Sequence, residues 1–353
     1  MVPLFHKEIF CMREESICKA PQAKTIAEEF VDRINAERRR EHLVRTAPLI
    51  VLIALALLGS VFVEGFFGLA NLRNLLNQSS IPLVLVTGLA FVILVGSIDL
   101  SIEGVMGFSG SIVTLMVANS KNAMDLGFWA IPITIAAGTL FGALSGLLHV
   151  KLRIPSFIVT FGMGSVATGL GVLSYRGMPA TVTDPLFASI AQGSFLHIPY
   201  LNWIALLVFG AGCFLQNSTA FGRAVYAIGD NEAVARSNGI RVDRVKIEAF
   251  AWCACCAAIA GVLGAIRLNR GEVIIGKDNL FTTITALVVG GVSLAGGSGG
   301  MFRALVGVVI VTVIQNCMIL IGVDPYKQEA IKGVIIILAV ALSVSRGRRV
   351  VVK

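Results

Sequence analysis

The chain has 353 residues, of which 56% are hydrophobic and 14% charged, and its mean hydropathy is +0.84. Length alone would allow two or three soluble domains, but only lipid solvates so much apolar surface. The net charge of +8 has no basic module with interleaved aromatic residues beside it, so the composition disfavours nucleic-acid binding and predicts an integral membrane protein.

The N-terminal residues 1–46 are polar and charged, and Ala23–Arg45 has the Ala, Glu and Arg content of a surface helix. The first apolar stretch starts too late and is too long for a signal peptide. We therefore expect residues 1–46 to form a cytoplasmic extension, and residues 47–353 to form one transmembrane domain within a lipid bilayer.

Windows of about 19 residues place apolar spans along the rest of the chain. The expected spans are 48–67, 80–97, 104–119, 127–149, 155–175, 200–216, 248–267, 280–297, 303–322 and 331–345. With the N-terminus inside, 21 of the 29 Lys and Arg residues fall on the inner side, which favours cytoplasmic placement of both termini. The sequence thus predicts an all-α polytopic membrane protein of about ten helices.

Cysteine and histidine give no sign of a metal or redox site. Five of the seven cysteines lie inside apolar runs and are interpreted as small core residues, and the four histidines are scattered along the chain. We expect no metal in this chain.

The longest charged segment inside the membrane domain is residues 217–247. Asp230 or Asn231 can cap a short helix over Glu232–Arg236, and Asn238-Gly239 can supply its left-handed stop. Because nucleation is costly, so short a helix is unstable alone in water. We expect it to dock on a partner, although a plain connecting loop remains an alternative.

Two further segments carry candidate chemistry. Gly271–Asp278 resembles a phosphate-binding loop, but Asp278 replaces the Ser or Thr that would bind magnesium, so we interpret the segment as a connection near the outer mouth. Asp99 and Glu103 are expected at the inner end of a span, where water reaches them. Asp99 would act there as a gate or helix cap with Ser101, and a proton relay is the rival interpretation.

Four stretches carry a resemblance to a known family. Gly222–Ile240 is similar to the cytoplasmic coupling loop of the ribose-type ATP-binding-cassette (ABC) importer permeases, with departures at Ser237 and Asn238. Gly96–Ser101 resembles the G-G-I-D-L-S motif of that family, and Lys151–Thr160 resembles its K-x-x-I-P-x-F-I-x-T motif. Val289–Gly297 resembles its G-G-x-S-x-x-G-G motif and also faintly repeats the stretch Val95–Leu100. The resemblance covers residue 48 to the end of the chain.

The resemblance implies a type II ABC importer-like fold in a bacterial cytoplasmic (inner) membrane. It also implies a second permease subunit, identical or not, an ATPase subunit that binds ATP and Mg, and a periplasmic or extracellular sugar-binding protein. The chain would then be no enzyme itself and would translocate a monosaccharide or sugar alcohol.

The loop residues expected to couple to the ATPase share one short segment. They are Gly222, Arg223, Gly229, Asp230, Asn231, Glu232, Ala233, Arg236 and Gly239. Polar residues inside spans are candidates for the translocation path or its gate, because sugars are bound by hydrogen bonds; helix-to-helix bonding is the alternative. These candidates are Asn77, Gln78, Asp99, Ser101, Thr160, Gln315 and Asn316.

Other functions stay open at this stage. A permease for branched-chain amino acids would share the broad fold. A proton-coupled carrier would use Asp99 and Glu103. A membrane enzyme acting on a lipid-linked substrate would need a cluster of acids or histidines at one interface, which the scattered residues do not supply.

Overall fold

The computed structural model describes residues 46–343, nearly all of which belong to one unit, Pro48–Lys353. The predicted N-terminal extension lies outside the described residues except for Thr46. The placement of both termini in the cytoplasm therefore stays a prediction.

Helices dominate the described residues, and six of them are long and apolar enough to cross a membrane. These are α3 (Leu69–Leu94), the stretch Gly127–Leu152 that contains α5 (Ala130–Leu152), α6 (Ser156–Tyr175), α8 (Tyr200–Ser218), α11 (Val242–Leu268) and α13 (Met301–Leu320). The remaining predicted spans contain the helix Thr46–Phe62, α4 (Ile102–Met116), α12 (Asn279–Val289) and α14 (Pro325–Ser343). An all-α polytopic architecture is confirmed, whereas a count of ten spanning helices is not decided.

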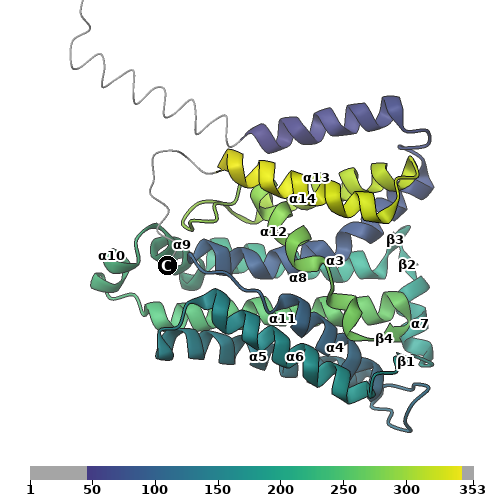
Figure 1. Ribbon diagram of the computed structural model, residues 1–353, viewed down its shortest axis with the longest axis horizontal. Coiled ribbons are helices and arrows are strands. Elements are labelled where there is room, and N and C mark those ends of the chain that lie inside the picture. Colours follow the sequence, from purple (N-terminus) through teal and green to yellow (C-terminus); the bar gives the residue numbers. More distant parts are fainter. Residues whose placement is uncertain (1–45, 344–353) are drawn as a thin grey trace, which may run out of the picture. The chain divides into compact units, whose positions relative to one another are not determined.

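Short elements lie at the two ends of the bundle (Figure 1). At one end are α9 (Ala220–Asp230) and α10 (Glu232–Ser237), and we call this the α10 end. At the other end are α7 (Pro185–Gln192) and two antiparallel pairs of two-residue strands, β1 (Ala180–Thr181) with β4 (Arg270–Gly271) and β2 (Ser194–Phe195) with β3 (Ile198–Pro199). The 3-10 turns η1 (Gly127–Trp129) and η2 (Val273–Gly276) complete the described elements.

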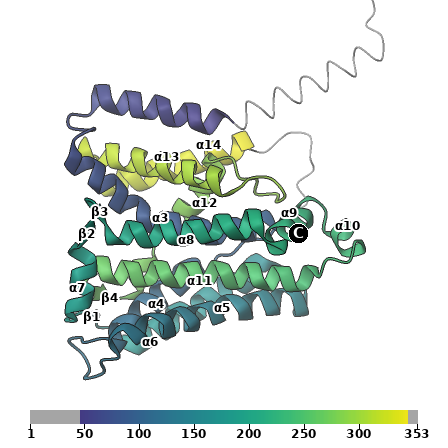
Figure 2. The same cartoon turned by 180° about the vertical axis from the view of Figure 1, so that it is seen from behind.

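Helix α11 runs through the middle of the bundle and packs against α3, α4 and α5 (Figure 2). Small residues allow this close approach, since no hydrophobic effect draws helices together in lipid. A Cβ added at Gly142 of α5 would overlap the carbonyl oxygen of Phe250, and one at Gly261 would overlap that of Met106. Cys253 and Cys256, three residues apart on α11, are buried where that helix lies close to Gly88 of α3.

Two of the predicted spans contain a helix that is much too short to cross a bilayer. Helix α4 has 15 residues and α12 has 11, which at about 1.5 Å per residue is well below the roughly 30 Å of a hydrocarbon core. A Cβ at Gly104, in the first turn of α4, would overlap the carbonyl oxygen of Gly164, and Gly164 lies near the middle of α6. Helix α4 therefore begins at mid-depth of the bundle.

The segment before α12 returns to the same depth. Strand β4 starts beside Thr114, at the far end of α4, and η2 then runs back along α4 until Gly276 touches the carbonyl of Glu103. The interpretation of Gly271–Asp278 as a simple outer connection was therefore wrong. The predicted span 280–297 was also wrong in its extent, because α12 ends at Val289 and a turn-rich loop follows.

The two halves of the domain repeat one packing pattern in opposite directions. Helix α4 packs on α5 and α6, as α12 packs on α13 and α14, while α5 contacts α11 and α13 contacts α3. From mid-depth, α4 runs toward the strand end and α12 runs toward the α10 end. This is the arrangement of an inverted repeat, a common plan in transporters.

The faint sequence echo between Val95–Leu100 and Val289–Leu294 has a different origin. Gly96 and Gly291 both have positive φ, 76° and 88°, and each ends a helix with the same pair of backbone hydrogen bonds. These positions are not equivalent in the packing repeat. The echo aligns Gly96 with Gly290, so it reflects this shared helix C-terminus one residue out of register; at such an end glycine adopts the left-handed conformation at little cost.

We expect Gly104→Ala to lower stability, because the new methyl group meets backbone that cannot move aside. Overpacking of this kind costs about 1–3 kcal/mol. Gly162→Ala, where nothing lies within 4 Å of the added carbon, is the matched control and should be neutral. Thermal unfolding of both variants in detergent tests this, and equal melting temperatures would contradict the close α4–α6 contact.

Candidate functional site

The predicted site residues fall into separate places rather than one pocket. Asp99, Ser101 and Thr160 meet at the non-helical segment before α4. Asn77, Gln78, Gln315 and Asn316 are spread over α3 and α13, and the coupling-loop residues lie on α9, α10 and the turns beside them.

The segment Val95–Ser101 is a non-helical stretch that connects the end of α3 to the start of α4. Its backbone is held by α6: Ile98 N donates to Ser156 Oγ at 3.1 Å and Leu100 N donates to Thr160 Oγ1 at 3.0 Å. Two of the motifs singled out in the sequence therefore bind each other directly. Thr160 has a structural task here, since an unpaired N–H at membrane depth costs several kcal/mol.

Asp99 is fully buried, so its expected position in water at the inner end of a span was wrong. Its Oδ1 accepts hydrogen bonds from Ser101 N at 2.8 Å and Ser101 Oγ at 2.6 Å. The expected partnership with Ser101 is thus confirmed, and it forms the tight turn that starts α4. Asp99 Oδ2 has no oxygen or nitrogen partner among the described residues, and the Cys253 thiol, a weak donor, faces this carboxylate.

The amide residues of α3 and α13 split into two kinds. Asn71 and Asn316 exchange two side-chain hydrogen bonds, of 3.1 and 2.9 Å, and both are buried. Asn316 therefore joins α13 to the start of α3 instead of facing a path, which is the helix-to-helix alternative. Gln315, its neighbour, points to a cavity on another side of α13.

Asn77 and Gln78 lie together on α3 toward the strand end of the bundle. The backbone oxygen of Asn77 accepts a 3.4 Å hydrogen bond from Arg267, near the end of α11. The Gln78 Oε1 atom is buried without a partner among the described residues. Both residues remain candidates for a polar path.

In residues 217–247, the segment predicted to couple to an ATPase, α9 packs onto the bundle itself. The Thr219 side chain caps it by accepting from Gly222 N at 3.2 Å, and Tyr226 Oη donates to the Gly299 carbonyl at 3.0 Å. A Cβ at Gly229 would overlap the Leu94 carbonyl oxygen at the end of α3. Gly222 is buried and Gly229 half-buried, and their close backbone contacts fix the position of α9, so a direct contact of either glycine with a partner protein stays a prediction.

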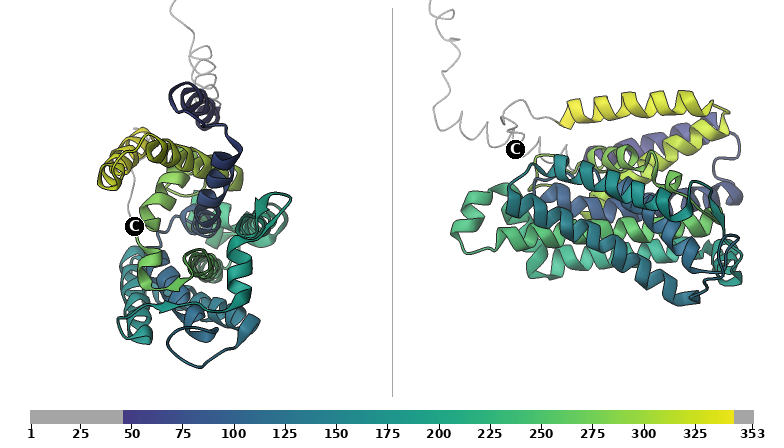
Figure 3. Two further views of the ribbon diagram at one scale, coloured as in Figure 1. Left: turned by 90° about the vertical axis from the view of Figure 1, so that its right-hand side faces the viewer. Right: turned by 60° about the horizontal axis from the view of Figure 1, so that its bottom comes forward.

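The short helix α10 projects beyond the other helices at its end of the bundle (Figure 3). Asn231 caps it by accepting from Val234 N at 3.1 Å, and Gly239 has φ 82° just after it. Both predicted signals are confirmed at these residues. The exposed residues are Asn231, Ala233, Val234, Arg236, Ser237, Asn238 and Gly239.

Ion pairs tie α10 to the start of α11. Arg236 lies 2.8 Å from Asp243 and 3.5 Å from Glu232, and Lys246 lies 2.9 Å from Glu232. The hydrogen bond and charge of Asp243 raise the pKa of Arg236, so its guanidinium is charged at every physiological pH. Exposed pairs contribute little stability singly, but together they fix the orientation of α10 on α11.

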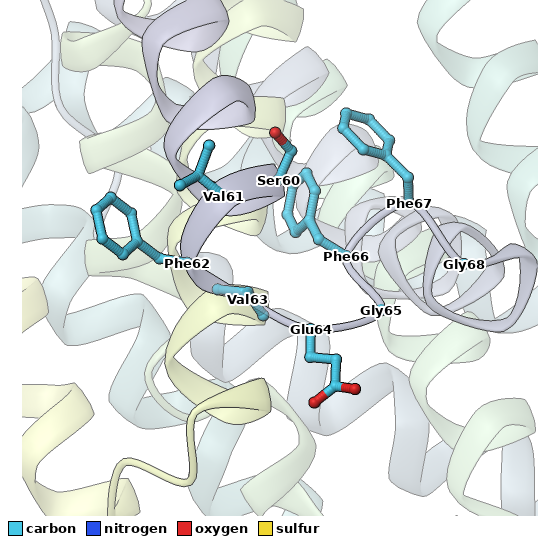
Figure 4. A pocket seen from close by; sticks show the side chains of 9 residues that line it. All are labelled: Ser60, Val61, Phe62, Val63, Glu64, Gly65, Phe66, Phe67 and Gly68. Atoms are coloured by element: carbon cyan, nitrogen blue, oxygen red, sulfur yellow. The ribbon is translucent and has the colours of Figure 1, made fainter.

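The cavities of the described domain include two with the following linings. One, shown in Figure 4, is formed by the consecutive residues Ser60–Gly68 between the first helix and α3, with Ser60 and Glu64 as its polar side chains. None of the predicted site residues lies in it. The other, of about 340 Å³, lies among α12, α13 and α14 and includes Gln315.

Comparison with known proteins then decides the family. Residues 71–340 match the family described as branched-chain amino acid transport system / permease component. The chain belongs to this family. No solved structure matches it.

Several curated relatives are sugar permeases. The chain is 33% identical over 302 residues to the ribose import permease RbsC of Haemophilus influenzae and of Escherichia coli, covering 84% of this chain and 92% and 93% of theirs. It is also 33% identical to the galactose/methyl galactoside import permease MglC of Haemophilus influenzae, covering 83% of this chain and 92% of the relative. The resemblance to ribose-type permeases is confirmed, and the chain is a multi-pass membrane permease.

Sequence reasoning missed several residues that position the site. Ser156 lies in the quoted motif but was not singled out, and Tyr226 and Val234 lie in the quoted loop. A hydroxyl four residues before Thr160 on one helix face was the available signal. Gly297 ends another quoted motif and was not singled out either. Its N–H donates to the Leu94 carbonyl at 3.0 Å, a contact between residues far apart in the sequence that no local pattern indicates.

We expect Thr160→Val to weaken both folding and transport, because Leu100 N loses its acceptor. An unsatisfied buried donor costs about 1–3 kcal/mol. Thr160→Ser keeps the hydroxyl and should rescue both properties. Melting temperature and uptake in the same preparation test this, and a Thr160→Val protein with unchanged stability would show that this bond does not hold the segment.

Proposed function

We propose that this chain is the permease subunit of an ABC importer for a monosaccharide or sugar alcohol, driven by a separate ATPase. The observation that carries this is the projecting, capped α10 on a chain whose relatives are ribose and galactose import permeases. A binding protein would deliver the sugar, and two permease subunits would form the transmembrane unit. On this reading ATP and magnesium bind the ATPase alone, and this chain catalyses no reaction.

The proposed topology places the α10 end in the cytoplasm of a bacterium and counts ten membrane segments. Eight would be continuous helices and two, α4 and α12, would each be completed by an extended segment. Support comes from the lengths of these elements and from the 21 of 29 Lys and Arg residues that fall on the inner side when both terminal segments are counted there. Both chain termini would then lie on the cytoplasmic side of the inner membrane.

Coupling would act through α10 and α9 as one rigid element. Helix α10 would seat in a groove of the ATPase, with Ala233, Val234 and Arg236 at its surface. Because Gly229 is packed on the Leu94 carbonyl and on Gly297, a push on α10 would reach the end of α3 and the loop before α13. Packed helices transmit such a displacement as a rigid-body shift.

The test is a charge placed at the exposed Val234, whose exposed fraction is 53%. We expect Val234→Asp to abolish copurification of the ATPase and stimulation of its activity, because a buried anchor is typically worth 2 kcal/mol or more, roughly thirtyfold in Kd. Met124→Asp, at an equally exposed residue near the strand end, is the control. Retained binding by Val234→Asp would refute docking through α10.

A proton-coupled carrier is the second candidate, favoured by the buried Asp99 carboxylate with its unpaired Oδ2. We expect Asp99→Asn to keep uptake within about tenfold, because the amide oxygen still accepts from Ser101 and a neutral acceptor costs only about 1 kcal/mol. Uptake should also resist an uncoupler while ATP is held high. Loss of uptake in the variant together with sensitivity to the uncoupler would favour proton coupling.

An amino acid cargo is compatible with the family description and would be distinguished by the binding protein. Ligand binding to that partner, measured by calorimetry with sugars and with branched-chain amino acids, gives the answer directly. We expect heat only with a sugar or polyol. The names of the curated relatives support this choice.

A further inference from the structure

We propose that a polar surface at mid-depth of the bundle lines the aqueous path along which the substrate crosses the membrane. This surface, which we call the midplane patch, consists of Glu103, Lys277, Asp278 and Thr282. The identity of the solute rests on the proposed function, whereas the contact of the patch with water does not.

The depth of the patch follows from its contacts. Glu103 lies in the first turn of α4, level with the middle of α6, and its Oε1 accepts a hydrogen bond from Leu280 N at 2.9 Å. This bond fixes the beginning of α12 at the beginning of α4. Lys277 and Asp278 come directly before α12, so they lie at the same depth, far from either end of the bundle.

The patch is open to its surroundings in the described domain. Lys277 and Asp278 are exposed, and Glu103 and Thr282 are half-buried. A charged side chain at the centre of a bilayer costs about 2.5–3.5 kcal/mol on insertion scales. Irregular backbone at this depth occurs only inside protein or beside a water-filled cavity. Acyl chains are therefore excluded as the neighbour of the patch.

The turn that carries the patch is satisfied by its own residues. Asn279 Nδ2 donates to the carbonyls of Ile275, Gly276 and Lys277 at 3.1–3.2 Å, and Thr282 Oγ1 donates to the Asp278 carbonyl at 2.8 Å. Asp278 holds the left-handed conformation, with φ 66°. A non-glycine residue there is uncommon and persists where its surroundings enforce it. The carbonyls of the turn are thus bonded internally, and the side chains at 277 and 278 point outside that network.

The cavity of about 340 Å³ continues from the patch, since Thr282 belongs to both. Its other polar lining residues are Thr285, Gln315, Glu329 and Lys332, and Phe281 contributes an aromatic ring. Glu329 and Lys332 form a 3.1 Å ion pair. Most of the remaining lining is apolar and comes from Val311, Ile314, Met318, Ile335 and Ile336. A mainly apolar cavity with a few polar groups is the usual composition of a small-molecule site, and its volume lies in the range of such sites.

A second permease copy seated directly on the patch is the rival occupant. It would bury the charges of Lys277 and Asp278 in a dry interface, where each would need a partner to offset its desolvation. A water-filled path needs no such partner. We therefore assign the patch to the path and not to the subunit contact.

The experiment uses the complete complex in membrane vesicles, with Lys277→Cys or Thr282→Cys in the chain and a small, charged, water-soluble thiol reagent. Leu140→Cys is the matched control: Leu140 is 58% exposed on α5, and its neighbours Gly138 and Gly142 contact Ala258 and Ala254 at the same depth. The labelling of the unsubstituted chain, whose Cys253 and Cys256 are buried, is subtracted as background.

We expect labelling at 277 and 282 to be at least about tenfold faster than at 140, because the reacting thiolate forms only in water, and to block sugar uptake. Each variant must first show the melting temperature of the unsubstituted chain in detergent, which shows that it is folded. Folded variants that stay unlabelled, or that form disulfides between two copies of the chain, would overturn the proposal. Labelling is measured without ATP hydrolysis. Absent labelling would therefore contradict the water-filled path without contradicting ATP-driven import, and a missing ATPase partner would contradict ATP-driven import without contradicting the path.

Discussion

The fold depends on hydrogen-bond partners for the backbone N–H and C=O groups of its non-helical segments inside the membrane. Lipid offers no donor or acceptor, so a non-helical segment at that depth needs partners from the protein. For Val95–Ser101 these are the hydroxyls of Ser156 and Thr160 and the Asp99 carboxylate. For the turn before α12 they are Asn279 and Glu103. The polar residues near the centre of the bundle serve this requirement first.

The first broken segment also connects α9 and α10, the proposed coupling element, to the centre of the bundle. Gly229 of α9 packs on the Leu94 carbonyl, where that segment starts, and Leu94 is hydrogen-bonded to Gly297. Non-helical backbone held by a few side-chain bonds is easier to shift than a continuous helix. A motion that begins at α10 would therefore reach Asp99 and the start of α4 through residues already in contact.

The inverted arrangement of the two halves explains why one depth collects so many polar groups. Each half contributes a long helix, a break and a short helix, and the two short helices begin side by side at Glu103 and Leu280. One break is buried within the bundle around Asp99, and the other is exposed at Lys277 and Asp278. The inverted repeat thus gives one break that is buried in protein, before α4, and one break that can face water, before α12.

The sequence by itself determined what depends on composition and on neighbours along the chain. Apolar runs predicted the helices, and the Asn231 cap and Gly239 stop defined α10 correctly, because capping acts within a few residues. Only the tertiary structure showed that Asp99 is buried, that Thr160 holds Leu100, that Asn316 pairs with Asn71, and that Gly271–Asp278 returns to mid-depth. These depend on contacts between residues far apart in the chain, and a hydropathy window averages an extended segment together with the short helix that follows it.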